Sequence, residues 1–169
     1  MRLRKNFYLL SSLIFSMTAL YTFNANAQCF NEAGKTYKID PDYLRAIAWQ
    51  ESRFKANAIN INKDKSKDVG LMQINTNNFS MLKKVFPYIN EKNLLNYPCF
   101  NVYVGGYILR KNFDRYGEKW ISVGMYNAGM KNQEKTIKNR YNYAKKINKH
   151  YNDIKNGHLS LPNLPILEK

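Results

Sequence analysis

The stretch from Asp40 to Ser52 constrains this chain most, because it predicts a long helix with a carboxylate on its apolar face. Asp40 can cap the free N–H groups at the helix start, and Pro41 suits the first helical position, where its missing N–H costs nothing. One face follows the i, i+3, i+4, i+7 spacing of a buried helix and is expected to run to about Phe54. Its members are Leu44, Ile47, Ala48, Glu51 and Phe54.

Glu51 stands where a core residue is expected. Burial would raise the pKa of its carboxyl group, because apolar surroundings disfavour the charged form. A carboxyl that still holds its proton near neutral pH can act as a general acid. The alternative is that Glu51 lies at the edge of the helix face and reaches water or pairs with Arg45 or Arg53. The helix pattern alone favours neither over the other.

The first 27 residues have the form of a cleavable signal peptide. Basic residues precede an apolar run from Phe7 to Phe23, and Ala25-Asn26-Ala27 has the small-x-small form that signal peptidase recognises. We therefore expect cleavage after Ala27, a mature periplasmic domain over residues 28–156 and a flexible tail over residues 157–169. A retained membrane anchor is the alternative, because the apolar run is near the lower length limit for a spanning helix.

The chain is strongly basic, with 27 Lys and Arg against 12 Asp and Glu and a formal net charge of +15. Removal of the leader subtracts three positive charges and no negative ones, which leaves +12. Such a domain should seek anionic surfaces, and a cell-wall polymer or a phospholipid headgroup surface fits an exported protein. Nucleic acid is not expected as a partner, because the basic residues are dispersed and no known binding motif is present.

Cys29 and Cys99 are the only cysteines. In an oxidising compartment an isolated pair is expected to form a disulfide rather than two free thiols, and closing so long a loop would stabilise the fold by about 4 kcal/mol. His150 and His158 are eight positions apart and have no Cys or carboxylate cluster beside them, so no metal site is predicted. We expect both histidines to be exposed to solvent, and no residue pattern calls for a cofactor.

The remaining pattern predicts a mainly α, single-domain fold without a strand-rich segment. Residues 55–67 read as a polar loop or flap, 68–75 as a buried strand or helix turn whose amides bond to backbone, and 93–98 as a turn. Gly105 and Gly106 cost about 1 kcal/mol each within a helix, which predicts a close helix crossing. Helices are expected over 29–37, 40–54, 79–86, 98–116, 120–125 and 136–154, the last with Ile137, Tyr141, Ala144, Ile147 and Tyr151 inward.

Three motifs, in this order, resemble the transglycosylase SLT domain, the lysozyme-like fold of bacterial lytic transglycosylases. They are Gln50-Glu51-Ser52, the run Gly70-Leu71-Met72-Gln73-Ile74-Asn75, and Tyr126-Asn127-Ala128-Gly129. The resemblance covers most of Cys29 to Asp153 and is closest to the small, invasion-associated members dedicated to type III secretion systems. It implies an enzyme that acts on peptidoglycan glycan strands and opens the wall for a secretion machine. We expect a monomer, with a periplasmic component of that machine as a candidate partner.

Carried over by matching position, the resemblance makes Glu51 the catalytic acid and base. It groups Ser52, which helps to hold the helix end, with the substrate-binding residues Gln73, Asn75, Tyr126 and Asn127. Two departures are visible in the sequence. Met125 replaces the small residue common before Tyr-Asn-Ala-Gly, and the loop over residues 55–67 cannot be matched residue by residue.

The chemistry implied is proton transfer from Glu51 to the glycosidic oxygen, followed by return of a proton from the sugar's own 6-hydroxyl to give a 1,6-anhydro product. We expect Asp68 to assist by stabilising positive charge on the sugar, whereas its simpler interpretation is an exposed turn residue or an Asx cap. Two other functions remain open at this stage: a hydrolytic muramidase that uses water, and a noncatalytic wall-binding scaffold of a secretion apparatus.

Overall fold

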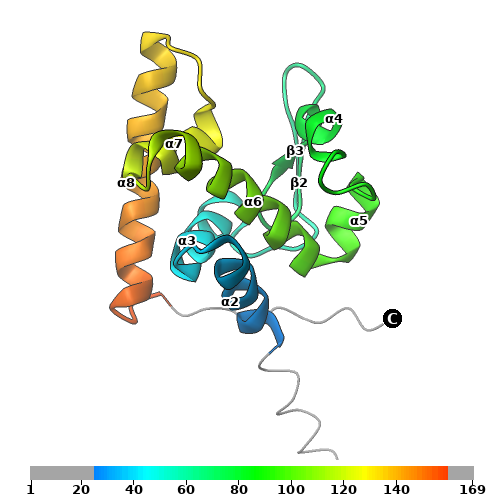
Figure 1. The fold of residues 1–169 in the computed structure, drawn as a ribbon, viewed down its shortest axis with the longest axis horizontal. Helices are drawn as coiled ribbons and strands as arrows, with labels where there is room; N and C mark the ends of the chain where they lie inside the picture. The colour runs from blue at the N-terminus through cyan, green and yellow to red at the C-terminus, as the bar shows by residue number, and fades with distance from the viewer. Residues whose placement is uncertain (1–24, 160–169) are drawn as a thin grey trace, which may run out of the picture.

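The computed structural model describes residues 25–159. Figure 1 shows helices around a central helix, α6, with a small sheet and two short helices on one side. The predicted leader up to residue 24 and the tail from residue 160 lie outside the described residues. The elements are α2 (Ala25–Tyr37), α3 (Pro41–Ser52), β1 (Ile59–Ile61), β2 (Lys67–Val69), β3 (Ile74–Asn75), the 3-10 helix η1 (Thr76–Asn78), α4 (Phe79–Leu82), α5 (Glu91–Asn96), α6 (Pro98–Tyr116), α7 (Trp120–Ala128) and α8 (Glu134–Lys155).

Helix α3 begins as the sequence predicts. The Asp40 carboxylate accepts a hydrogen bond of 3.0 Å from the backbone N–H of Asp42, and Pro41 occupies the first turn. The helix ends at Ser52 rather than at Phe54, because Arg53 and Phe54 have φ angles of 53° and 60°. Two successive residues in the left-handed region cannot continue a right-handed helix. The end of α3 therefore places Glu51 in the last helical turn.

The structure contains a three-stranded antiparallel sheet, of which β2 and β3 fall largely within residues 68–75, the stretch predicted as a buried strand or helix turn, whereas β1 was not predicted. Strand β1 lies inside the stretch predicted as a loop, and it pairs with β2, which pairs with β3. All three β1 residues are exposed, and β3 has only two residues. Strands this short show no alternation of apolar and polar residues, so no period-2 signal marks β1 or distinguishes a strand from a helix turn over residues 68–75.

The other boundaries differ by a few residues. Helix α4 is shorter than the predicted helix over residues 79–86, and α5 occupies most of the predicted turn. The start of α5 has a side-chain cap, in which Asn90 accepts from the backbone N–H of Asn93 at 2.8 Å. Helices α7 and α8 extend beyond the predicted spans 120–125 and 136–154.

The inner face of α8 is also corrected, because Tyr141 is 63% exposed whereas Tyr143 is buried. The buried face consists of Arg140, Tyr143, Ala144 and Ile147, which keeps the i, i+3, i+4, i+7 spacing. Arg140 belongs to it because its Nε and Nη2 atoms donate to the carbonyls of Gly129 and Lys131, both at 2.7 Å. A charged residue on the inward face shifted the apolar pattern that the prediction followed.

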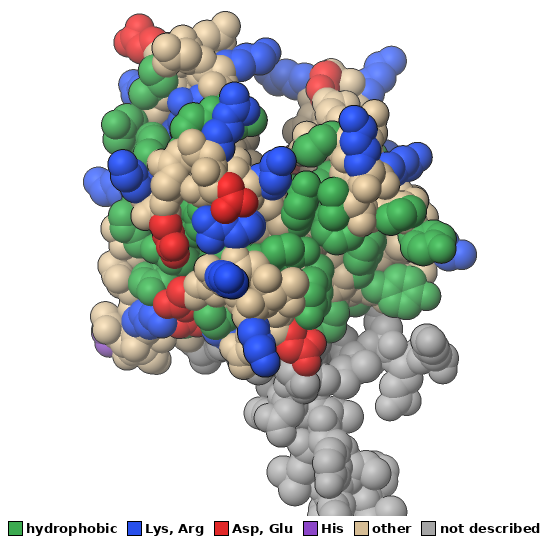
Figure 2. All heavy atoms as spheres, in the orientation of Figure 1, with side chains coloured by type: hydrophobic (Ala, Val, Ile, Leu, Met, Phe, Trp, Pro, Cys, Tyr) green, Lys and Arg blue, Asp and Glu red, His purple; other side chains and the backbone are tan. Residues whose placement is uncertain are grey.

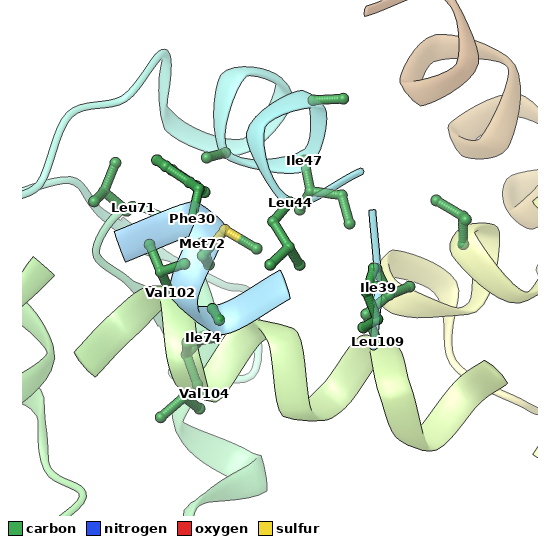
Figure 3. Packing of buried hydrophobic residues seen from close by; sticks show 14 of the residues in the cluster. Phe30, Ile39, Leu44, Ile47, Leu71, Met72, Ile74, Val102, Val104 and Leu109 are labelled. Atoms are coloured by element: carbon green, nitrogen blue, oxygen red, sulfur yellow. The ribbon is translucent and has the colours of Figure 1, made fainter. Parts of the chain in front are cut away.

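The core forms where α2, α3 and α6 meet the turn that carries Met72 (Figure 3). The predicted close approach at the two central glycines of α6 is confirmed. A Cβ atom on Gly105 would lie 2.7 Å from Met72 Cε, and one on Gly106 would lie 2.8 Å from Tyr37 Cδ2. The missing side chains thus let α6 approach both α2 and the turn.

A network of charges and hydroxyls joins the start of α3 to the end of α8. The Tyr151 hydroxyl donates to Asp40 Oδ2 at 2.7 Å, and Lys155 Nζ lies 2.9 Å from Asp40 Oδ2 and 2.8 Å from Asp42 Oδ2. These contacts fix the two helices side by side. Because Glu51 lies on one of them and Tyr143 on the other, the network also sets the geometry of the site.

The predicted disulfide is confirmed, and it joins Cys29 in α2 to Cys99 in the first turn of α6. His158 is exposed as expected, but His150 is half-buried, with its Nε2 atom 3.1 Å from Gln50 Oε1. No helix within residues 25–159 has the length and apolar character needed to cross a membrane.

Candidate active site

Glu51 lies on the wall of a cleft of about 830 Å³. Glu51 is half-buried, and its pKa is raised from 4.5 to about 7, chiefly by burial. A hydrogen bond from Tyr143 lowers this pKa, and the charge of Asp68 raises it further. Low-polarity surroundings disfavour the ionised form, which is why burial dominates. A large fraction of Glu51 therefore carries a proton at neutral pH.

The surface ion-pair interpretation of Glu51 is wrong. Arg45 Nη1 instead pairs with Asp42 Oδ1 at 2.6 Å. The Arg53 guanidinium lies over the Trp49 ring, 4.6 Å from its centroid, and donates to the Trp49 carbonyl at 3.1 Å. Neither arginine is positioned to neutralise Glu51, so the carboxyl group keeps its raised pKa.

Tyr143 is the direct partner of Glu51, and its hydroxyl donates to Glu51 Oε1. The phenol is buried, and its own pKa is raised well above 10 by burial and by the neighbouring carboxyl charge. Tyr143 therefore keeps its hydroxyl proton near neutral pH and acts as a donor to Glu51. Tyr143 was not predicted from the sequence, in which the only signal is its place four positions before Ile147 on the inner face of α8.

The turn between β2 and β3 carries Gln73 into the cleft. Gln73 has a φ of 47°, and its Nε2 atom donates to the carbonyls of Gly70 at 2.8 Å and Ala58 at 3.2 Å. The expectation that this amide bonds to backbone is confirmed for its nitrogen. Because both N–H groups are committed, Oε1 is the atom left to accept from a ligand.

Asn101 of α6 holds this turn from behind, and the sequence analysis did not single it out. Its Oδ1 atom accepts from the Met72 N–H at 2.8 Å, and its Nδ2 atom donates to the carbonyls of Val69 at 2.8 Å and Leu94 at 3.3 Å. Gly70 has a φ of 78°, and a Cβ atom there would lie 2.1 Å from Asn101 Nδ2. Glycine is thus required at this position by both conformation and space.

Asp68 also lines the cleft, where β2 pairs with both neighbouring strands. Its Oδ1 atom accepts from Asn75 Nδ2 at 2.7 Å, and its Oδ2 atom accepts from Asn62 Nδ2 at 3.0 Å and Asn60 Nδ2 at 3.4 Å. Asp68 is therefore a strand residue held by amides, and not the turn residue or Asx cap of the simpler interpretation. These contacts fix its carboxylate within electrostatic range of Glu51.

The same contacts change how Asn75 is understood. Its Nδ2 atom is shared between Asp68 and the Ser66 hydroxyl, and its Oδ1 atom accepts from the Asn77 N–H at 2.8 Å. Asn75 lies on the cleft wall, but its polar atoms bond to the protein. Its clearest role in the structure is to orient Asp68.

Ser52 lies outside the cleft, because it is buried and its hydroxyl lies within hydrogen-bonding distance of the carbonyls of Ala48 at 3.2 Å and Leu71 at 2.8 Å. The Leu71 contact joins the last turn of α3 to the turn that carries Gln73. This geometry supports the part of the expectation in which Ser52 holds the helix end, and it gives the hydroxyl no access to a ligand.

Helix α7 contributes the opposite wall. The Tyr126 hydroxyl donates to the Met72 carbonyl at 2.9 Å, and its pKa is raised by burial first and then by the charges of Glu51 and Asp68. Asn127 is exposed on the cleft wall, and Met125, the departure from the common motif, is buried beside it. The structure thus brings Tyr126 and Asn127 to the same cleft as Glu51, as the motifs predicted.

Figure 2 shows the cleft as a hollow between two lobes, with Lys and Arg side chains around its rim. The lobe on the sheet side contributes Asn62, Lys63, Asp64 and Met81, and the helical lobe contributes Ile108, Lys111, Asn112 and Met130. Within residues 25–159 no group of three His, Cys, Asp or Glu side chains is close enough to hold a metal ion. The carboxyl groups of Glu51 and Asp68 on an open cleft support acid–base chemistry on an extended ligand.

Comparisons with known proteins show which family this chain is related to. Residues 28–149 match the model of the Transglycosylase SLT domain. The chain is 45% identical over 129 residues to "Invasion protein IagB" of Salmonella typhimurium (strain SL1344), which covers 76% of this chain and 78% of that protein. It is 34% identical over 142 residues to "Protein IpgF" of Shigella flexneri, which covers 84% of this chain and 91% of that protein.

A solved structure shares the fold. It is an inactive mutant of lytic transglycosylase Slt from Pseudomonas aeruginosa, with a TM-score of 0.61 and 21% sequence identity. The alignment covers 85% of this chain but only 26% of the Pseudomonas chain, so this protein corresponds to about a quarter of that longer one. The mainly α, lysozyme-like fold class predicted from the sequence is confirmed.

Proposed function

This chain belongs to the Transglycosylase SLT domain family and is a peptidoglycan lytic transglycosylase, and we propose that it cleaves the β-1,4 bond between N-acetylmuramic acid and N-acetylglucosamine to leave a 1,6-anhydro product. The observation that carries this proposal is Glu51, a half-buried carboxyl group with a pKa of about 7 on the wall of an open cleft. A group with this pKa can give and take a proton at neutral pH.

The reaction uses Glu51 twice. Its carboxyl group gives a proton to the glycosidic oxygen as the bond from that oxygen to C1 of the muramic acid breaks, and the leaving sugar departs with a free 4-hydroxyl. The substrate's acetamido group and the negative charge of Asp68 stabilise the positive charge that develops on the ring. The 6-hydroxyl oxygen of the muramic acid then bonds to C1, while the Glu51 carboxylate takes the proton of that hydroxyl. This step restores the protonated acid.

Tyr143 and Ser52 act on this cycle through Glu51 and the helix end that carries it. The Tyr143 hydroxyl holds Oε1, which leaves Oε2 as the oxygen that exchanges the proton with the sugar. Gln73 Oε1 and the exposed amide of Asn127 are polar groups available to bind the glycan strand. A single acid–base residue is sufficient where the substrate supplies its own stabilising group.

Mass spectrometry of digested sacculi tests the proposal. A transglycosylase gives products that lack a reducing end and weigh one water less than hydrolysis products. The second candidate, a hydrolytic muramidase, is favoured by one observation, the second carboxylate of Asp68 on the same cleft wall. Reducing-end products from the wild type, absent with Glu51→Gln, would establish that alternative and overturn the first.

We further propose a periplasmic location reached through a signal peptide cleaved after Ala27. The N-terminal pattern, the Cys29–Cys99 disulfide and a peptidoglycan substrate all support it. N-terminal sequencing of the protein from a periplasmic fraction should begin at Gln28. A mature protein that retains Phe7 to Phe23 would instead establish a membrane anchor.

The similarity to a protein named for invasion supports a role in opening the wall locally for a type III secretion system. In a strain that lacks this gene, the wild type should restore assembly of the machine and Glu51→Gln should not. Equal complementation by both would favour the noncatalytic scaffold. Pull-down of the mature domain should recover a periplasmic component of the machine, and sedimentation should show a monomer.

A further inference from the structure

Asn112 of α6 is an anomaly on the cleft wall. The residue is only 7% exposed, yet it lines the cleft. Its Nδ2 atom is buried and has no hydrogen-bond partner among residues 25–159. A buried N–H group without a partner costs the fold about 1 to 3 kcal/mol.

The second buried asparagine in the described part of the chain shows what a structural amide looks like here. Asn101 is fully buried, and both its Oδ1 and Nδ2 atoms bond to backbone groups. A leucine at position 112 would have a similar volume and would avoid the cost of the unpaired N–H group. The unpaired amide is therefore explained better by a ligand than by the fold.

The surroundings of Asn112 identify the chemistry of that ligand. Ile108 lies one helical turn earlier on the same face of α6, and Met125 and Met130 line the cleft with it. An N–H donor needs an acceptor oxygen, and the apolar side chains that line the same cleft offer surface for a methyl group. A sugar hydroxyl would supply the acceptor but no methyl group, whereas an acetamido group supplies both.

We propose that the Asn112 side-chain amide donates to the carbonyl oxygen of an acetamido group on the glycan strand, while Ile108 and Met125 contact its methyl group. The inference rests on the proposed function, because it takes the N-acetylated glycan as the substrate. The terminal torsion of asparagine is soft, so a small rotation presents the N–H group to the cleft. Asn112 is then a substrate-binding and specificity-determining residue that is separate from the proton transfer at Glu51.

Calorimetry with the inactive Glu51→Gln variant tests this inference without turnover. The probe is the β-1,4-linked hexamer of N-acetylglucosamine. We expect Glu51→Gln/Asn112→Leu to bind it about tenfold more weakly, the effect of one lost neutral hydrogen bond. The unfolding temperature should be equal or higher, because the unpaired amide is gone. Glu51→Gln/Asn142→Leu, which changes an exposed asparagine on α8, should bind like the parent.

A second measurement does not depend on the folding of a variant. In nitrogen-15 spectra of Glu51→Gln, the side-chain amide signal of Asn112 should shift when the hexamer is added. An unchanged signal, or equal affinities with and without Asn112→Leu, overturns the role of Asn112 while the proposed function stands. A lower unfolding temperature together with weaker binding would make the role structural and also overturn it. Absence of hexamer binding to Glu51→Gln itself would overturn the inference that the cleft recognises acetamido groups of a β-1,4-linked strand, while digestion of sacculi tests the proposed function separately.

Discussion

Replacement of Glu51 by glutamine should change the pH dependence of stability in a direction fixed by the structure. The pKa of Glu51 is about 7 in the folded protein against 4.5 in the unfolded chain. Between these values the folded state binds more protons, so the free energy of unfolding of the wild type falls as the pH rises through this window. At about 1.36 kcal/mol per pH unit, the full loss is about 3 kcal/mol.

The substituted amide does not ionise, and its oxygen can still accept from the Tyr143 hydroxyl. Glu51→Gln should therefore gain about 3 kcal/mol relative to the wild type between pH 4 and pH 8, while losing transglycosylase activity. Urea unfolding followed by circular dichroism at one-unit pH steps measures this difference. The matched control is Glu118→Gln, because Glu118 is an exposed glutamate.

The control should differ from the wild type by a small amount at every pH. A difference between Glu51→Gln and the wild type that stays constant within about 0.5 kcal/mol from pH 4 to pH 8 would refute the reasoning. It would mean that the cleft leaves the carboxyl group hydrated and that burial does not raise its pKa.

Tyr143→Phe should move the alkaline limb of the pH profile of kcat/KM upward by about one pH unit, because it removes a hydrogen bond that lowers the Glu51 pKa. Asp68→Asn should move the same limb downward, because it removes a charge that raises the Glu51 pKa. A shift of the alkaline limb in the same direction in both variants, or unchanged turnover of Asp68→Asn on purified peptidoglycan, would contradict the assigned roles. Gly70→Ala should cost more than about 2 kcal/mol in urea unfolding, whereas Gly129→Ala, also at positive φ but in open space, should cost about 1 kcal/mol; equal costs would exclude the close contact as the cause. Reduction of the disulfide should lower the free energy of unfolding by about 4 kcal/mol, measured with and without reductant, and an unchanged midpoint would show that the 70-residue loop it closes contributes little.

Much of the helical framework could be predicted because its signals are local. The cap at Asp40 and the proline at the first turn of α6 act on their own backbone neighbours, so their effect is the same in any fold. A strand within residues 68–75 was one of two predicted interpretations, but β1 and the pairing of the three strands were missed, because pairing depends on partners that the local pattern does not reveal. The prediction placed Tyr141 on the inner face of α8, where the structure has Arg140. An arginine was not expected inward, because the carbonyls of Gly129 and Lys131 to which it donates lie outside the helix.

The sequence by itself determined that a capped helix carries Glu51 on an inward face and that two further motifs follow in a fixed order. Only the tertiary structure decided what surrounds that carboxyl group. Tyr143 lies 92 positions away from it, and Asp68 is held by the amides of Asn60 and Asn75 from the neighbouring strands. The pKa of a side chain depends on its burial and on the charges within a few ångströms of it. The residues that provide both come from segments far apart in the sequence. The same reason hid Asn112, whose unpaired amide is visible only once the cleft has formed around it.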